Sequence, residues 1–347
     1  MNPLLADDRE SDAPARAVAP IRFDLTAAEV SEICDLVIVP LLLRGGSAGD
    51  ILRRDAPFVA RSLPLRLQRF LFAFRCEEPA GACVIGGWPV DDADAGPTPA
   101  HWTPEAFPSR VLEHELYLVL LGSLLGDVFS WSNVQDGRFV QDLLPVRGQE
   151  HEQSAGSSSS RMELHSEDAF SPLRCDYLGL MCLRNDDRVS TSYASLDGVV
   201  LSADHRRVLL EPRFLVRPDD ERRRRVAVRG GTPPSSVRTP VLFGDRESPY
   251  LVVDGRYTET DPEDTEAAEA LAALLGQLKA KQADIALTPG EVLFIDNYRS
   301  VHGRAPFRAR YDGRDRWLKR VNVTRDLRKS RAARSRLDSY VIAAGQA

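Results

Sequence analysis

A histidine and a carboxylate stand two positions apart in the segment Leu164–Phe170, as His165 and Glu167. In an extended segment the side chains at positions i and i+2 point to the same side, so both groups can reach one point in space. His302 is a candidate third ligand far downstream. Two histidines and one carboxylate on one face of an ion, with its other positions open, form the ligand set of non-haem Fe(II) oxygenases. Because a lone His-x-Glu often occurs by chance, other segments must decide whether this one is a site.

Two arginines, Arg316 and Arg320, lie four positions apart in a predicted strand and therefore face the same side. The planar guanidinium group matches both oxygens of a carboxylate, so these side chains could hold an oxo-acid and an amino acid. The simpler alternative is a solvated edge strand in a chain that is rich in arginine. Thr191 could add a hydrogen bond to the oxo-acid, although a strand threonine is structural by default. Asp296 and Asn297 are candidate turn residues or supporting groups beside the third ligand.

The composition limits the class of protein. The chain has 347 residues, of which 43% are hydrophobic, enough for one large domain or two ordinary ones. Its net charge of −6 argues against a nucleic-acid-binding surface, and the four arginines at 222–225 are expected in a solvated loop. No apolar run reaches the roughly 18 residues of a transmembrane helix. The five cysteines form no Cys-x-x-Cys pair, which predicts reduced thiols and a cytoplasmic location.

Periodicity predicts the elements that must position these groups. Helices are expected over 26–37, 63–73, 110–131 and 265–286, the first with a capping box of Thr26 and Glu29. Strands are expected over 81–87, 139–145, 177–184, 189–196, 249–254, 290–296 and 317–324. His114 in the third helix is expected to pack or to face solvent, because nothing near it completes a metal site.

The order of these elements predicts the domain organisation. Many strands without alternating strand–helix units indicate an antiparallel β core with helical additions. Residues 1–20 are expected to be a disordered leader, residues 21–331 a single domain and residues 332–347 a peripheral tail. The arginine-, proline- and glycine-rich stretch over 212–236 is expected to be a lid loop, and the serine run at 156–160 a flexible approach to His165.

Three longer segments carry a family pattern: 158–177 (SSSRMELHSEDAFSPLRCDY), 294–304 (FIDNYRSVHGR) and 310–327 (RYDGRDRWLKRVNVTRDL). In this order they resemble the clavaminate synthase-like (TauD-type) group of Fe(II)/2-oxoglutarate-dependent oxygenases. The resemblance runs from about Phe23 to Arg331 and is greatest to the free amino-acid hydroxylases of antibiotic pathways. It implies a mainly β fold with helical additions (α+β) around a double-stranded β-helix, the cupin-like jelly roll.

The resemblance also implies the cofactors and their ligands. Fe(II) would be bound by His165, Glu167 and His302. The co-substrate 2-oxoglutarate would be held by Arg316 with help from Thr191, and O2 would be the second co-substrate. A glutamate as the carboxylate ligand, where most related oxygenases have aspartate, is itself typical of this group.

The same resemblance assigns the substrate contacts. Arg320 would bind the carboxylate of a free amino acid. Gln135 would contact the α-amino group, which Glu167 would also face. Ser157 belongs to the serine run that borders the substrate in this family. The expected partner is therefore a small molecule, with no nucleic acid and no membrane, and the oligomeric state stays open.

One position departs from the family pattern. Related arginine hydroxylases clamp the substrate guanidinium with an Asp-x-Asp pair, and here Asp254 is kept while Arg256 replaces the second acid. Because a cation repels a guanidinium group, a cyclic guanidino amino acid or asparagine competes with arginine as the expected substrate.

The expected activity is hydroxylation of C3 of a free L-amino acid, arginine or a guanidino relative, in the biosynthesis of a peptide antibiotic. Hydroxylation at C4, desaturation and ring closure stay open, because they depend on small differences in the placement of a C–H bond. A catalytically silent β-helix protein that binds a small acid is the alternative from another class.

Overall fold

The computed structural model of this chain describes residues 19–40, 55–102, 111–152, 154, 156–218 and 238–343. The expected leader over 1–20 lies almost wholly outside these ranges, as does most of the expected lid loop over 212–236. The last four residues of the expected tail also lie outside them. Within the described ranges, no helix combines the length and the apolar character that crossing a membrane requires.

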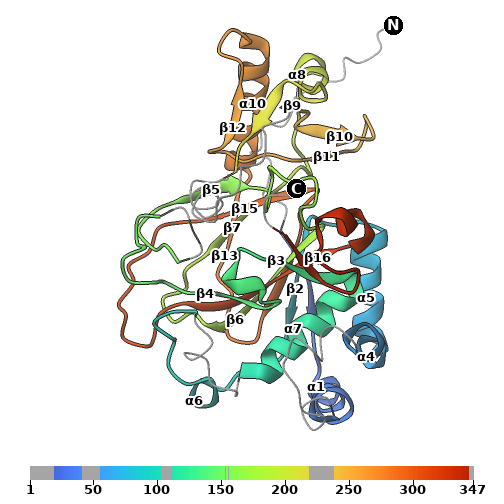
Figure 1. Cartoon of the computed structure of the whole chain (residues 1–347), viewed down its shortest axis with the longest axis vertical. Coiled ribbons are helices and arrows are strands. Elements are labelled where there is room, and N and C mark those ends of the chain that lie inside the picture. The colour runs from blue at the N-terminus through green and yellow to red at the C-terminus, as the bar shows by residue number, and fades with distance from the viewer. Residues whose placement is uncertain are drawn as a thin grey trace, which may run out of the picture.

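Two sheets form the centre of the fold. The large one has eight strands in the order β1-β2-β14-β6-β16-β3-β17, with β4 beside β16. Its strands are β1 Ile21–Asp24, β2 Ala82–Gly86, β3 Asp127–Trp131, β4 Gln141–Leu143, β6 Tyr177–Arg184, β14 Val292–Asp296, β16 Trp317–Thr324 and β17 Val341–Ile342. The small sheet has the order β13-β7-β15-β5 and consists of β5 Met162–His165, β7 Thr191–Ser195, β13 Ala283–Ile285 and β15 Ser300–Arg304. A shared apolar cluster packs them face to face as the predicted double-stranded β-helix (Figure 1).

Helices cover the outer face of the large sheet, and an extension that contains α8, α10 and the strands β8 to β12 covers the outer face of the small sheet. A second apolar cluster joins the large sheet to α1 Ala27–Ile33, α4 Ala56–Val59, α5 Leu65–Cys76 and α7 Leu112–Leu125. A third joins the small sheet to α8 Ala203–Leu209 and α10 Thr265–Ala280, which rise above it in Figure 1. The extension also contains β8 Phe214–Val216, β9 Arg238–Thr239, β10 Leu242–Gly244, β11 Pro249–Leu251 and β12 Thr258–Thr260. The short helices are α6 Asp92–Ala95, η1 Cys34–Ile38, η2 Ala60–Ser62, η5 Gln135–Gly137 and η6 Leu327–Ala333.

Most predicted elements are confirmed, and two predicted helices are too long. The helix predicted over 110–131 ends at Leu125, and Asp127–Trp131 forms β3 beside β16. A Cβ on Gly126 would lie 2.3 Å from the Thr324 carbonyl oxygen, so the chain leaves the helix at a close backbone approach. The helix predicted over 265–286 ends at Ala280, and β13 then pairs with β7.

The serine run and the C-terminal segment pack more closely than expected. Ser157 and Ser158 are each 1% exposed, and the backbone N–H groups of residues 158–160 all donate to the Glu150 carbonyl oxygen. β17 pairs in parallel with β3, and Ile342 is buried between the two sheets. The many charged residues over 325–338 concealed the apolar contact that Ile342 makes farther along the tail.

His114 packs inside the helical layer, as predicted for a structural histidine. It is 2% exposed, and its Nδ1 accepts a hydrogen bond from Trp88 Nε1 at 3.1 Å. Burial, helped by the charge of Lys319, lowers the pKa of His114 to about 4. The folded protein therefore keeps this imidazole neutral above about pH 4.

This depressed pKa predicts a pH-dependent stability. As the pH falls below about 6.5, the unfolded chain binds a proton at His114 before the folded chain does. The stabilisation present above that pH is lost by pH 4, about 3 kcal/mol in total. A His114→Gln variant keeps an acceptor for Trp88 but does not titrate. In denaturant titrations, the free energy of unfolding of the wild type should fall more steeply between pH 7 and 4.5 than that of His114→Gln. If the two proteins lose the same free energy over this range, His114 does not have the lowered pKa.

Candidate active site

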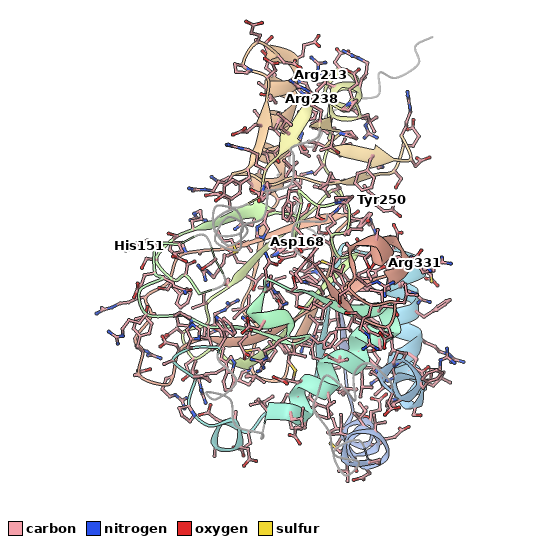
Figure 2. All side chains as sticks on the ribbon, viewed as in Figure 1. His151, Asp168, Arg213, Arg238, Tyr250 and Arg331 are labelled. Carbon is pink, nitrogen blue, oxygen red and sulfur yellow. The ribbon has the colours of Figure 1, made fainter. Side chains whose placement is uncertain are left out.

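The space between the two sheets opens into a cavity that encloses, with its mouth, about 1330 Å³. Seven of the predicted site residues line it, namely Gln135, His165, Glu167, Thr191, His302, Arg316 and Arg320. A second cavity, lined by Asp254 among others, shares His165, Glu167 and Asp168 with the first. In Figure 2, Asp168 lies near the middle of the molecule, below the extension on which Arg213 and Arg238 are labelled. The structure therefore brings most of the predicted site together.

His165 and His302 lie opposite each other on the neighbouring antiparallel strands β5 and β15, with ring centroids 4.3 Å apart. Glu167 Oε2 lies 3.7 Å from His165 Nε2 and 3.4 Å from His302 Nε2. One ligand atom from each residue lies within 4.8 Å of the other two, and no second such cluster exists in the described ranges. A transition-metal ion about 2 Å from each ligand fits this set after small adjustments. The donor types and their spacing thus suit one metal ion.

Two of the three ligands hold the protonation state that metal binding requires, whereas a metal ion must displace a proton from the His165 ring. Burial opposes protonation of His165, but its contact with Glu167 raises its pKa to about 9. Burial opposes ionisation of Glu167, but the charge of Arg320 and the two histidines hold its pKa well below the ordinary value of 4.5. Burial and the neighbouring His165 lower the pKa of His302 to about 4, so this ring is neutral at pH 7. His165 Nδ1 lies 2.9 Å from the Glu163 carbonyl oxygen, a contact that orients Nε2 toward the other ligands.

Glu167 lies in a turn just after β5 rather than on the strand itself. Its backbone is held by the side chain of Asn297, which the sequence had marked as a candidate supporting residue. The next residue, Asp168, has φ of 52°, and its carboxylate accepts a hydrogen bond from Trp131 Nε1 at 2.6 Å. The side chains of His165 and Glu167 therefore lie close together, as predicted. The Glu167 backbone, however, is held by the Asn297 side chain and not by pairing with a neighbouring strand.

Arg320 on β16 and Arg316, the residue immediately before this strand, both line the cavity, as the alternation predicted. Arg320 donates from Nη1 to Glu167 Oε1 and from Nε to Gln141 Oε1, each at 2.8 Å. Arg316 is 8% exposed and donates from Nη2 to Thr191 Oγ1 at 3.1 Å. Burial lowers its pKa to about 10, and its Nε has no partner among the described residues. Arg316 thus holds a buried positive charge that can accept an anion.

Arg304 is a further cavity residue that the sequence analysis missed. It is 6% exposed and donates to the Ser157 carbonyl oxygen at 2.5 Å and to Ser157 Oγ at 2.8 Å. Burial and the charge of Arg316 lower its pKa to about 10. Ser157 therefore lies behind Arg304 and does not line either cavity. Since His302 and Arg304 are two positions apart on β15, the rule applied to His165 and Glu167 would have identified Arg304.

Gln135 reaches the cavity but is also held from behind. Its Oε1 accepts from the Asp142 backbone N–H at 2.9 Å, and its Nε2 donates to the Asp142 carbonyl oxygen at 2.8 Å. The second hydrogen of Nε2 can serve a ligand. The Asp142 carboxylate in turn pairs with the fully buried Lys319, which also contacts Glu115. Nothing in the local sequence distinguished Lys319 from a solvated lysine.

Asp254 lies beside the histidine cluster, because it forms an isolated β-bridge with His165. Its Oδ1 accepts from the backbone N–H groups of Arg256 and Tyr257 at 2.8 and 2.9 Å. The Arg256 side chain borders the second cavity but is exposed, with its guanidinium 5.6 Å from the centre of the Tyr257 ring. This position leaves the Asp254 carboxylate near the cluster while the Arg256 charge lies toward solvent.

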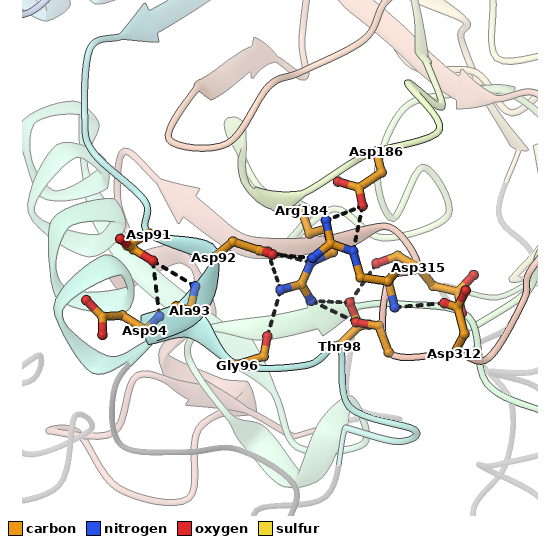
Figure 3. A network of polar contacts seen from close by, with 12 residues as sticks. Asp91, Asp92, Ala93, Asp94, Gly96, Thr98, Arg184, Asp186, Asp312 and Asp315 are labelled. Carbon is orange, nitrogen blue, oxygen red and sulfur yellow. Dashed lines mark hydrogen bonds and ion pairs between the residues drawn. The ribbon is translucent and has the colours of Figure 1, made fainter.

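A buried network holds the segment that leads into Arg316 (Figure 3). Arg184 donates to Thr98 Oγ1 at 2.8 Å, and this hydroxyl donates to the Asp315 carbonyl oxygen at 2.7 Å. The Asp315 carboxylate accepts from the backbone N–H groups of residues 310 and 311 at 2.8 and 2.6 Å. Because Asp315 immediately precedes Arg316, the network restricts the direction in which the arginine enters the cavity.

Comparisons with known proteins agree with this geometry. The family described as taurine catabolism dioxygenase TauD, TfdA family, matches residues 120–322. The chain is 40% identical over 348 residues to an L-ornithine/L-arginine 3-hydroxylase of Catenulispora acidiphila, covering 92% of this chain and 99% of the relative. It is 42% identical over 306 residues to an enduracididine beta-hydroxylase of Streptomyces hygroscopicus, covering 83% of this chain and 89% of the relative.

Solved structures match over nearly the whole chain. Crystal structures of the non-heme iron oxygenase OrfP are 40% identical to this chain and cover 92% of it and 99% of their own chain, with a TM-score of 0.85. One contains Fe, succinate and (3S)-hydroxy-L-Arg, and another contains Fe and alpha-ketoglutaric acid.

Proposed function

Because this chain belongs to the TauD/TfdA family of dioxygenases, we propose that it hydroxylates C3 of a free L-amino acid with a guanidino side chain, using Fe(II), 2-oxoglutarate and O2. The observation that carries the proposal is the meeting of a His-Glu-His cluster with buried arginines in one cavity. A silent binding protein would not require a metal-ligand set and two separate anion-binding groups around it. We further propose that the product serves the biosynthesis of a peptide antibiotic.

In this proposal His165, Glu167 and His302 bind the iron, and Arg316 with Thr191 holds the distal carboxylate of 2-oxoglutarate. The bound iron and 2-oxoglutarate supply the oxidation: O2 and 2-oxoglutarate give succinate and CO2, and one oxygen atom enters a C–H bond of the substrate. Arg304 adds a second positive charge to the same end of the cavity. An incoming dicarboxylate would neutralise these buried charges, which favours its binding there.

The remaining groups orient the amino acid. Arg320 already pairs with Glu167, so a substrate carboxylate bound by its guanidinium lies beside the metal centre. Gln135 is held by its two bonds to Asp142, and its Oε1 keeps a second lone pair that can accept a hydrogen bond from an α-ammonium group. We propose that this amide borders the α-amino group, which Glu167 also attracts. Anchoring both α-substituents near Glu167 brings C3 close to the iron.

The negative charge of Asp254 favours a substrate whose side chain carries a positive charge. The Asp254 backbone pairs with that of His165 and its charge acts on the His165 ring, whereas the Arg256 guanidinium lies over Tyr257 and toward solvent. A guanidinium group, open or cyclic, can pair with Asp254. An asparagine side chain lacks that charge and gains less from the same position. We therefore propose arginine or a cyclic guanidino amino acid as the substrate.

The charge of Asp254 predicts a change in substrate preference. An Asp254→Asn variant should raise the KM for arginine about 10- to 100-fold, because a charge-assisted hydrogen bond becomes a neutral one. The KM for an uncharged amino acid should change much less. Arg256→Asp, which adds a second acid next to the first, should lower the KM for arginine. An unchanged KM in both variants would place the side-chain pocket elsewhere.

The state of the cysteines indicates the compartment in which the enzyme acts. All five cysteines are free thiols, and Cys83, Cys175 and Cys182 are buried. Free thiols are typical of a reducing compartment. We propose that the enzyme acts in the cytoplasm.

A further inference from the structure

Asn297 lies in the turn between β14 and β15, five residues before His302, and is 0% exposed. Its Oδ1 accepts a hydrogen bond from the Glu167 backbone N–H at 2.7 Å. Its Nδ2 donates to the Glu167 carbonyl oxygen at 3.0 Å and to the Cys175 carbonyl oxygen at 2.9 Å. One side-chain amide thus pairs with both backbone polar groups of the proposed carboxylate ligand.

This pairing takes the place of a missing strand neighbour. β5 ends at His165, so Glu167 has no ladder partner for its N–H and C=O groups. A carboxamide carries an acceptor and a donor side by side, as a peptide group does, and so can bind both groups of one residue. Asp168, the next residue, has the left-handed φ of 52°, a conformation that persists only where its surroundings hold it. The backbone direction at Glu167 therefore depends on Asn297.

Asn297 also connects this turn to the strand that carries His302. Its own backbone N–H donates to the Asp176 carbonyl oxygen at 2.9 Å, which fixes the turn against the start of β6. Three residues later the chain enters β15. A single buried residue is thus bonded to the segment of Glu167 and is continuous with the segment of His302.

We propose that Asn297 is the positioning residue of the metal centre: its amide sets the place of the Glu167 carboxylate relative to His165 and His302, and thereby the affinity for a divalent metal ion. The inference rests on the proposed metal-binding function of this cluster. Asn297 lines neither cavity, so its effect passes through the backbone of Glu167 and not through contact with the metal or the substrate.

The chain offers a matched control in Asn185, which is 6% exposed. Its Oδ1 accepts from the Val189 backbone N–H at 2.9 Å, and its Nδ2 donates to the carbonyl oxygens of Val189 at 3.1 Å and Leu287 at 2.9 Å. These three bonds to backbone groups match those of Asn297, which additionally contacts Cys175 Sγ at 3.6 Å, but they hold the turn after β6. Removing either amide therefore has a similar cost for folding, and only one removal reaches the backbone of Glu167.

The test is a calorimetric titration of the full-length, metal-free protein with Mn²⁺ alone, without 2-oxoglutarate or amino acid. Loss of a group that orients a metal ligand typically weakens metal binding about 10- to 100-fold. We expect this loss for Asn297→Ala, with wild-type affinity for Asn185→Ala. If Asn297→Ala does not fold, as judged by circular dichroism, Asn297→Ser is used in its place.

A second readout separates positioning from general destabilisation. The visible spectrum of the Co²⁺ form depends on the number and geometry of the ligands. It should change in the Asn297 variant and match the wild type in Asn185→Ala. Wild-type affinity and spectrum in the Asn297 variant, or equal losses in both variants, would overturn the inference. Absence of Mn²⁺ binding by the wild type would instead overturn the proposed metal centre itself.

Discussion

Replacement of His302 by alanine is expected to abolish metal binding and, with it, amino-acid-dependent formation of succinate. His302 provides one of the three ligand atoms, and its low pKa already keeps it in the neutral form that binds metal. Removing a ligand should cost more than the roughly 10- to 100-fold that loss of an outer partner costs. Titration with Mn²⁺ and a succinate assay measure the two effects.

A matched control is His114→Gln, which changes another buried histidine at a distance from the cluster. His114 bonds to Trp88 inside the helical layer and lines neither cavity. This variant should bind Mn²⁺ as the wild type does. Wild-type metal affinity in His302→Ala would show that the cluster is not the metal centre.

The second large effect is expected at Arg316. An Arg316→Met variant should raise the KM for 2-oxoglutarate about 30-fold or more, since losing one member of a buried charge pair costs about 2–5 kcal/mol. Arg316 is 8% exposed in the wild type, and its one hydrogen bond to another described side chain goes to Thr191. The carboxylate of 2-oxoglutarate is therefore its expected counter-ion. Steady-state kinetics with varied 2-oxoglutarate at saturating iron measures the change.

Arg320→Met is the matched comparison, because it removes the other guanidinium on the same side of β16. It should raise the KM for the amino acid and, through the lost bond to Glu167, weaken metal binding. At saturating iron its KM for 2-oxoglutarate should stay near the wild-type value. If both variants raised the same KM, the two arginines would not serve two different carboxylates.

The sequence was sufficient wherever local geometry decided the outcome. Alternation along a strand placed Arg316 and Arg320 on one side. The spacing of His165 and Glu167 correctly predicted neighbours, although Glu167 lies in a turn after β5 and not in the expected extended segment. The pairing of His165 with His302 came from family-like segments, because spacing alone does not predict which distant strands become neighbours. The C-terminal boundary of α7 failed for a related reason, since an apolar run fits a buried helix and a buried strand equally well.

The supporting contacts could not be predicted, because they join residues far apart in the chain. Asn297 meets Glu167 across 130 positions, and Lys319 meets Glu115 across 204. A buried lysine and a solvated one have the same local sequence pattern. Ser157, which family likeness places in the run that borders the substrate, is likewise joined to a distant residue, since its hydroxyl and carbonyl oxygens both accept bonds from Arg304.

The most direct test of the whole account is an assay of the purified protein with Fe(II), 2-oxoglutarate and O2. The amino acids to be compared are L-arginine, L-ornithine, a cyclic guanidino amino acid and L-asparagine. We expect succinate formation that depends on a guanidino amino acid, and a product heavier by one oxygen atom, about 16 Da. NMR should place the new hydroxyl group on C3. No succinate above the substrate-free rate with any of these amino acids, in protein that has bound iron, would contradict the account.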